Sequence, residues 1–248
     1  MQPVLFWGTN ETKRLECHAE GNDLFQLFIV NVLLSMLTLG GYRFWGKTRI
    51  RQYLWSQISF DEEGFEYTGL GKELFRSFLG ALGIFACLIA ASQGMEYGLS
   101  LVAPGFERTV GVAFSLALYL LAGIGAYSAR RYLLSHTCWR SIRFGQSGSS
   151  GAYAKKLLFS QLLSVFSLGL STPFRRNYLT SYQLNNTWFG SERLIYDGKG
   201  RDLFACFLMA YLLLIPTLGL SWFWYKAEEY RYMAAHTQLQ GARFAVTI

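Results

Sequence analysis

The chain has 248 residues, of which 52% are hydrophobic, 17% aromatic and only 16% charged. Soluble domains carry about 25% charged residues, so this composition argues against a soluble enzyme and against a disordered tail. The cysteines at positions 17, 87, 138 and 206 are scattered and do not form the framework of a secreted disulfide-rich domain. The class that remains is a protein that crosses a membrane several times.

Five long uncharged stretches follow one another along the chain. They cover residues 24–42, 77–95, 109–129, 157–174 and 203–225. A helix needs about 20 apolar residues to cross a bilayer, and a segment in lipid must satisfy its own backbone hydrogen bonds. We therefore predict a mainly α polytopic membrane protein with about five hydrophobic helices, forming a single membrane domain over residues 1–248.

Basic residues concentrate in segments 43–76 and 130–156, which hold six each, whereas segment 96–108 holds one. The positive-inside rule places the two basic segments in the cytoplasm and the N-terminal arm outside. Segment 175–201 is also basic and conflicts with strict alternation, so its side of the membrane, that of the C-terminus and the complete crossing of 157–174 stay open. The net charge of +7 requires no nucleic acid, since such bases meet anionic lipid headgroups at the cytoplasmic face.

The chain is similar to itself. Residues 21–65 align without a gap to residues 200–244, with 15 of 45 positions identical. Shorter matches, such as Leu168-Gly169 with Leu39-Gly40 and His136-Thr137 with His236-Thr237, indicate two further copies. We predict roughly four internal repeats, at about 21–75, 120–153, 155–204 and 200–248.

Each copy is predicted to contain a hydrophobic helix, a turn, a short interfacial helix and a β-hairpin. The predicted turn residues are Gly40, Gly169 and Gly219, because glycine leaves helical geometry most readily. Aromatic and basic residues that follow the turns are typical of the lipid–water boundary. The predicted interface and lipid-contacting residues are Trp45, Lys47, Arg49, Arg51, Trp224 and Lys226.

These motifs resemble a known family. The pattern Gly21-x-x-Leu24-Phe25, then Leu37-Thr38-Leu39-Gly40, Trp45 and Lys47, then Phe65-x-Tyr67-x-Gly69-x-Gly71, is similar to the YjgN family of bacterial inner-membrane proteins, whose domain has no known function. The resemblance covers essentially the whole chain. It implies a multi-pass protein of the bacterial inner membrane and brings no activity. Pro173-Phe174 stands where the first copy has Phe44-Trp45, which puts the interfacial helix of that copy in question.

Motifs of catalysis and metal binding are missing from the sequence. It has three histidines and no His-Glu-x-x-His, Gly-x-Ser-x-Gly, P-loop or Cys-x-x-Cys pattern. We therefore predict no enzyme activity, no catalytic residues, no cofactor and no metal. Glu96 lies at the end of an uncharged stretch, where an acid can mark a solute or proton path, but the sequence favours the alternative that it ends the helix at the outer interface.

Two functions remain open. The first is binding or transport of a small solute, because internal repeats are common in transporters. The second is a non-catalytic membrane scaffold or lipid-contacting protein, which the basic interfacial residues favour. An interfacial enzyme ranks last, and the oligomeric state is unknown.

Overall fold

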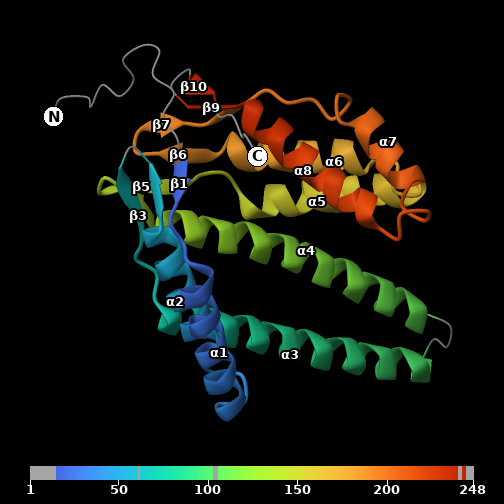
Figure 1. Cartoon of the computed structure of the whole chain (residues 1–248). Helices are drawn as coiled ribbons and strands as arrows, with labels where there is room; N and C mark the ends of the chain where they lie inside the picture. Colours follow the sequence, from blue (N-terminus) through green and yellow to red (C-terminus); the bar gives the residue numbers. More distant parts are fainter. Residues whose placement is uncertain (1–14, 61, 103–105, 240–241, 244–248) are drawn as a thin grey trace. The chain divides into compact units, whose positions relative to one another are not determined.

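The computed structural model describes residues 15–60, 62–102, 106–239 and 242–243 (Figure 1). The predicted fourth repeat, 200–248, therefore ends partly outside the described residues. The described helices are α1 (Gly21–Leu37), α2 (Arg43–Ser56), α3 (Gly71–Val102), α4 (Glu107–Ser135), α5 (Ser150–Phe166), α6 (Thr172–Leu184), α7 (Phe204–Leu212) and α8 (Leu220–Ala235). The described strands are β1 (Leu15–Cys17), β2 (Ile58–Phe60), β3 (Glu63–Tyr67), β4 (Thr137–Trp139), β5 (Ile142–Gln146), β6 (Thr187–Phe189), β7 (Glu192–Arg193), β8 (Ile195–Tyr196), β9 (Thr237–Leu239) and β10 (Ala242–Arg243).

The chain forms two compact units. The N-terminal unit comprises the described residues of 11–119 and 132–143, and the C-terminal unit comprises those of 120–131 and 144–248. In the N-terminal unit α2 packs against both α1 and α3. In the C-terminal unit α5 packs against α6, α6 against α7, and α7 against α8 (Figure 1). A small core of Phe207, Ala210 and Tyr225 joins α7 to α8.

Strand pairing is antiparallel throughout the described residues. In the N-terminal unit β1 pairs with β2, β2 with β3, β3 with β4, and β4 with the first two residues of β5. In the C-terminal unit the last three residues of β5 pair with β6, and β6 pairs with β7. The order β1 to β7 is thus a seven-stranded sheet, and β8, β9 and β10 form a second sheet of three strands. The fold is mainly helical, as predicted, but the predicted hairpins join into sheets.

The three predicted turn glycines each lie in a left-handed turn that joins two helices. Gly40, Gly169 and Gly219 have φ values of +87°, +86° and +88°. The amide of Gly40 donates to the carbonyl of Ser35 at 2.7 Å, and the other two glycine amides donate to the carbonyl five residues earlier at 2.8 Å. These bonds satisfy carbonyls at the end of the first helix, and the missing Cβ keeps the cost of positive φ low.

The turns divide the uncharged stretches. Residues 157–174 and 203–225 are each two helices joined by a turn, so the prediction of one hydrophobic helix per stretch does not hold for them. Among the described residues, α3 over its whole length and α4 from Thr109 are the helices long and apolar enough to cross a membrane. The most apolar part of α3 is 0% buried.

The interfacial helix that Pro173 put in question is present as α6. Pro173 lies in the first turn of α6, where a missing amide hydrogen costs no helical bond. The next residue, Phe174, packs closely against Gly200. Trp45 packs against Gly71 in the same way. A Cβ on Gly71 would lie 2.8 Å from the Cα of Trp45, and one on Gly200 would lie 2.8 Å from the Cα of Phe174.

We therefore expect Gly71→Ala and Gly200→Ala each to lower the midpoint of thermal unfolding in detergent. The neighbour is backbone and cannot rotate away, so the cost is that of overpacking, about 1–3 kcal/mol. Gly83→Ala is the matched control, because Gly83 lies within α3 with open space around it and alanine favours a helix. A midpoint for Gly71→Ala equal to that of Gly83→Ala would contradict the close contact.

Candidate functional site

The predicted interface residues lie on two helices. Trp45, Lys47, Arg49 and Arg51 are on α2, and Trp224 and Lys226 are on α8. Trp45 packs on the ring of Phe75 in α3, with 5.6 Å between ring centroids. Trp224 is exposed. The structure thus places one predicted set in each compact unit.

Arg43, Lys47 and Arg51 recur every four residues and so share one face of α2. Burial lowers the pKa of the Lys47 ammonium below its ordinary value, and the positive charges of Arg51 and Arg43 lower it further. Within the described part of the chain, none of these three bases forms an ion pair with an acid. Arg51 donates from Nη1 to the hydroxyl of Tyr67 at 3.2 Å. This face, which we call the α2 basic row (Arg43, Lys47 and Arg51), carries concentrated positive charge.

In the C-terminal unit the corresponding base is neutralised. Lys226, which aligns with Lys47, places Nζ 2.6 Å from Oε2 of Glu229. Arg176 of α6 places Nη1 2.7 Å from the same oxygen. Glu229 is 1% exposed, and burial raises the pKa of its carboxyl while Arg176 opposes that rise. A buried carboxylate held by two cations is a fixed structural group, because loss of the acid would leave two bases without a counter-charge.

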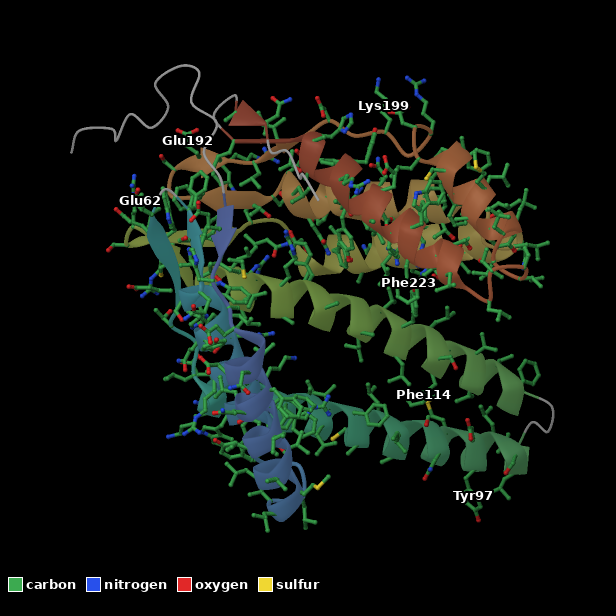
Figure 2. All side chains as sticks on the ribbon, viewed as in Figure 1. Glu62, Tyr97, Phe114, Glu192, Lys199 and Phe223 are labelled. Atoms are coloured by element: carbon green, nitrogen blue, oxygen red, sulfur yellow. The ribbon has the colours of Figure 1, made fainter. Side chains whose placement is uncertain are left out.

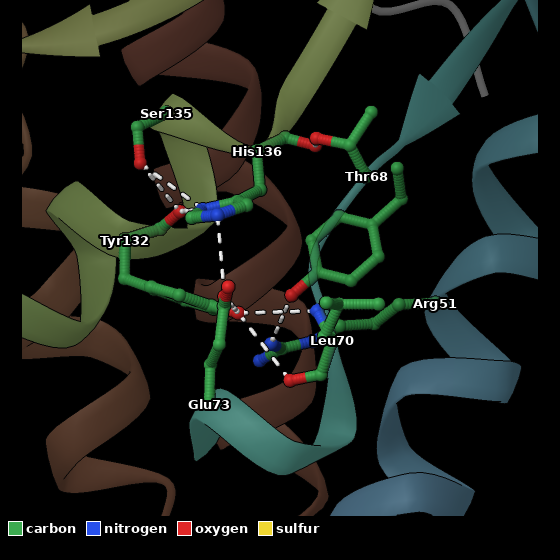
Figure 3. A network of polar contacts seen from close by, with 8 residues as sticks. Arg51, Thr68, Leu70, Glu73, Tyr132, Ser135 and His136 are labelled. Atoms are coloured by element: carbon green, nitrogen blue, oxygen red, sulfur yellow. Dashed lines mark hydrogen bonds and ion pairs between the residues drawn. The ribbon is translucent and has the colours of Figure 1, made fainter. Parts of the chain in front are cut away.

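A tyrosine near the end of α4 contacts the start of α3 (Figure 3). The Tyr132 hydroxyl accepts from the amide of Leu70 at 3.3 Å and donates to Oε2 of Glu73 at 2.7 Å. His136 stacks on the Tyr132 ring with 4.1 Å between centroids, and its Nε2 lies 3.4 Å from Glu73. Its Nδ1 is 2.8 Å from the carbonyl of Tyr132. A carbonyl only accepts, so Nδ1 carries a proton.

The same contact occurs at the ends of three other helices. The Tyr232 hydroxyl accepts from the amide of Lys199 at 2.8 Å and donates to Asp202 at 2.7 Å. The Tyr182 hydroxyl accepts from the amide of Ser149 at 3.1 Å, and that of Tyr53 accepts from the amide of Glu20 at 3.3 Å. In these three cases the tyrosine lies 33 residues after its partner, and in the case of Tyr132 it lies 62 residues after. Glu20, Leu70 and Ser149 immediately precede α1, α3 and α5, where an amide has no helical acceptor, and Lys199 precedes the turn that leads into α7.

Glu96 is half-buried on α3 and separate from these contacts. With Gln93, Tyr97 and Ser100 it lines an open depression of about 390 Å³. Tyr97 points away from the helix into open space (Figure 2). These side chains belong to one helix, and the structure places none of the predicted bases beside them.

Sequence reasoning treats the tyrosines as membrane anchors and misses their hydroxyl contacts. A signal exists, since Tyr53 and Tyr232 match in the alignment and the acids Asp23 and Asp202 match as well. Glu229 has no such signal, because an acid beside Glu228 on a polar helix normally faces solvent. Among the described residues there is no group of three or more acid, histidine or cysteine side chains that could hold a metal ion.

We expect Tyr132→Phe and Tyr232→Phe to lower the thermal unfolding midpoint by more than Tyr97→Phe does. Each loses a hydroxyl that accepts from a backbone amide and donates to an acid, a net loss of about 1 kcal/mol per hydrogen bond. Tyr97 is 70% exposed, which makes it the control for loss of a hydroxyl alone. Equal midpoints for Tyr132→Phe and Tyr97→Phe would show that the contact contributes no stability.

Comparison with known proteins agrees with the inner-membrane resemblance. Residues 12–216 match the family described as a bacterial protein of unknown function (DUF898). The chain is similar to Inner membrane protein YjgN of Escherichia coli O157:H7, with 21% identity over 82% of this chain and 57% of that protein. The relative of the same name in Escherichia coli strain K12 is 26% identical over the same shares. The Salmonella typhimurium relative is 27% identical over 58% of this chain and 34% of its own length.

The chain therefore spans little more than half the length of the first two of these relatives. No solved structure matches it. The matched residues include α1 and its turn, the α2 basic row and both long apolar helices. The chain belongs to the YjgN (DUF898) family of bacterial proteins of unknown function.

Proposed function

We propose that this chain is a multi-pass protein of the bacterial inner membrane that catalyses no reaction and contacts anionic lipid headgroups. Two features together support the proposal: α3 exposes apolar side chains along its length, and the α2 basic row beside it contains bases that pair with no acid among the described residues. The most apolar part of α3 has no buried residues, and water would make that exposure costly. Lipid removes this cost, and the relatives are named inner membrane proteins.

The bases suit the headgroup region. The α2 basic row lies on a helix that adjoins α1 and α3, so its charges sit beside apolar surface. Arg49, also on α2, lies over the ring of Tyr42 at 5.9 Å, and Trp45 is exposed at its edge. Tryptophan, tyrosine and bases gather at the level of lipid headgroups, where an apolar body and a polar end are both satisfied.

We also infer that the chain is built from four copies of a helix–helix–hairpin unit, over residues 21–67, 71–146, 150–196 and 200–243. The tyrosine contacts support this division, because each joins the last turn of a second helix to the backbone just before the first helix of that copy or, for Tyr232, just before the turn that leads into it. The division differs from the predicted second unit, 120–153, because α3 becomes the first helix of that copy. On this reading α3 and α4 are the lengthened members of the series.

If the chain contacts anionic headgroups, its unfolding temperature should depend on headgroup charge. We expect the wild-type chain in lipid nanodiscs to unfold at a higher temperature when phosphatidylglycerol is present than in phosphatidylcholine alone. Each base near an anionic surface contributes about 1 kcal/mol, and added salt should reduce the difference because it screens exposed charges. An unfolding midpoint that is the same in both lipids would count against the proposal.

A second candidate, a path for a proton or small cation along α3, is favoured by one observation. Glu96 and its polar neighbours lie at the end of the long uncharged stretch of α3, where an ionisable side chain is costly to keep. Gln93 and Ser100 supply further polar side chains beside the Glu96 carboxyl, as an ion path requires.

If this path operates, Glu96→Gln should abolish ion flux in proteoliposomes while Gln93→Glu retains it, since the first removes the titratable group and the second adds one. Expression and unfolding midpoint of both variants should match the wild type. Flux that persists in Glu96→Gln would exclude this residue from any path.

A further inference from the structure

A basic residue occurs at the same aligned position of three helices, but its surroundings differ between them. Lys47 of α2, Arg176 of α6 and Lys226 of α8 occupy matching positions, because Leu39-Gly40 and Tyr53 align with Leu168-Gly169 and Tyr182. Arg176 and Lys226 both contact Oε2 of Glu229. The residue of α2 that aligns with Glu229 is Ile50, which has no charge. The acid that both C-terminal bases contact therefore has no counterpart beside Lys47.

The N-terminal helix also has more bases than its counterpart. The positions of α8 that align with Arg43 and Arg51 are Trp222 and Tyr230, so α8 has one base where α2 has three. Like charges four residues apart on a helix repel each other and destabilise it. Burial and the two neighbouring arginines lower the pKa of Lys47, as expected for a cation held among cations. The α2 basic row is thus a strained charge arrangement that an anion would relieve.

The chemistry of the three bases indicates which anion fits. Two guanidinium groups and one ammonium along a face present several N–H donors and no acceptor, a set suited to the oxygens of a phosphate. Consecutive bases on one helix face lie about 6 Å apart, which allows two of them to share one phosphate group. Arg51 keeps donors free, since one contact is to the Tyr67 hydroxyl.

We propose that the α2 basic row is a specific binding site for a phosphate group, carried by an anionic phospholipid headgroup, and that α8 has lost this site through Glu229. The proposal rests on the lipid-contacting function and narrows it to one face of one helix. Glu229 acts in α8 as a built-in substitute for the anion. The N-terminal unit therefore binds lipid phosphate, whereas the C-terminal unit satisfies its bases internally.

The decisive variant introduces into α2 an acid at the position that matches Glu229 of α8. Ile50→Glu places a carboxylate three residues after Lys47, which reproduces the spacing of Lys226 and Glu229. The matched control is Ile50→Gln, because glutamine has nearly the same shape as glutamate and carries no charge. Lys47→Gln removes a base from the row, whereas Arg49→Gln removes an equal charge two residues away, on the opposite side of the same helix. Circular dichroism and the unfolding midpoint in neutral detergent establish that each variant is folded.

Binding is measured by titrating short-chain phosphatidylglycerol into the purified chain in neutral detergent and following tryptophan fluorescence. Phosphatidylcholine of the same chain length is the blank. We expect Lys47→Gln to bind about fivefold more weakly than Arg49→Gln, and Ile50→Glu about fivefold more weakly than Ile50→Gln, because one base near an anion is worth about 1 kcal/mol. Inorganic phosphate is titrated in parallel to separate a free phosphate from a lipid headgroup.

The possible results separate the site from the wider function. Equal weakening by Lys47→Gln and Arg49→Gln, or by Ile50→Glu and Ile50→Gln, would overturn the specific site and leave a general contact with anionic lipid intact. If inorganic phosphate binds saturably in a Lys47-dependent way and phosphatidylglycerol does not bind, the claim that the phosphate belongs to a lipid headgroup would be overturned. No response of the wild type to either ligand would overturn the site, and the nanodisc comparison then decides the lipid-contacting function independently.

Discussion

The hydroxyl of a tyrosine near the end of one helix, bonded to the backbone at the start of another, is the contact on which the described fold depends. The first amides of a helix have no acceptor within the helix, and in an apolar environment that deficiency is expensive. Tyr53, Tyr132 and Tyr182 each supply the missing acceptor, and Tyr232 accepts from Lys199, just before the turn that leads into α7. The acids Glu73 and Asp202 then accept from Tyr132 and Tyr232, at helix ends where negative charge is favourable.

This contact sets the ends of a helix pair and leaves its length free. Three of the tyrosines lie 33 residues after their partner, and Tyr132 lies 62 residues after Leu70. Between Leu70 and Tyr132 lie α3 and most of α4, which among the described residues are the helices long and apolar enough to cross a membrane. The left-handed turns at Gly40 and Gly169 follow closely on the ends of α1 at Leu37 and α5 at Phe166, whereas α7 ends at Leu212, seven residues before Gly219.

Charge is distributed differently over helices that otherwise correspond. On α8 and α6 two bases converge on the buried carboxylate of Glu229, so the interaction is internal. On α2 the three bases repel one another and pair with no acid among the described residues, and Arg51 donates to the hydroxyl of the buried Tyr67. Two differences account for this contrast: α8 has the acid Glu229 where α2 has Ile50, and it has Trp222 and Tyr230 where α2 has Arg43 and Arg51. Under our proposal, helices with similar sequences therefore differ in their requirement for an external anion.

The sequence by itself determined the membrane class, the helical content, the short hairpins and the positions of the turns. These features follow from local properties: long uncharged stretches, glycine after Leu, and aromatic residues around short polar runs. The family resemblance rested on the same local motifs, and the comparison with known proteins confirmed it. The tertiary structure decided which uncharged stretches are single helices, how the hairpins join into sheets, and which polar side chains meet. Those outcomes depend on partners distant in the sequence, as Glu229 depends on Arg176 and Tyr132 on Leu70, and no local pattern records them.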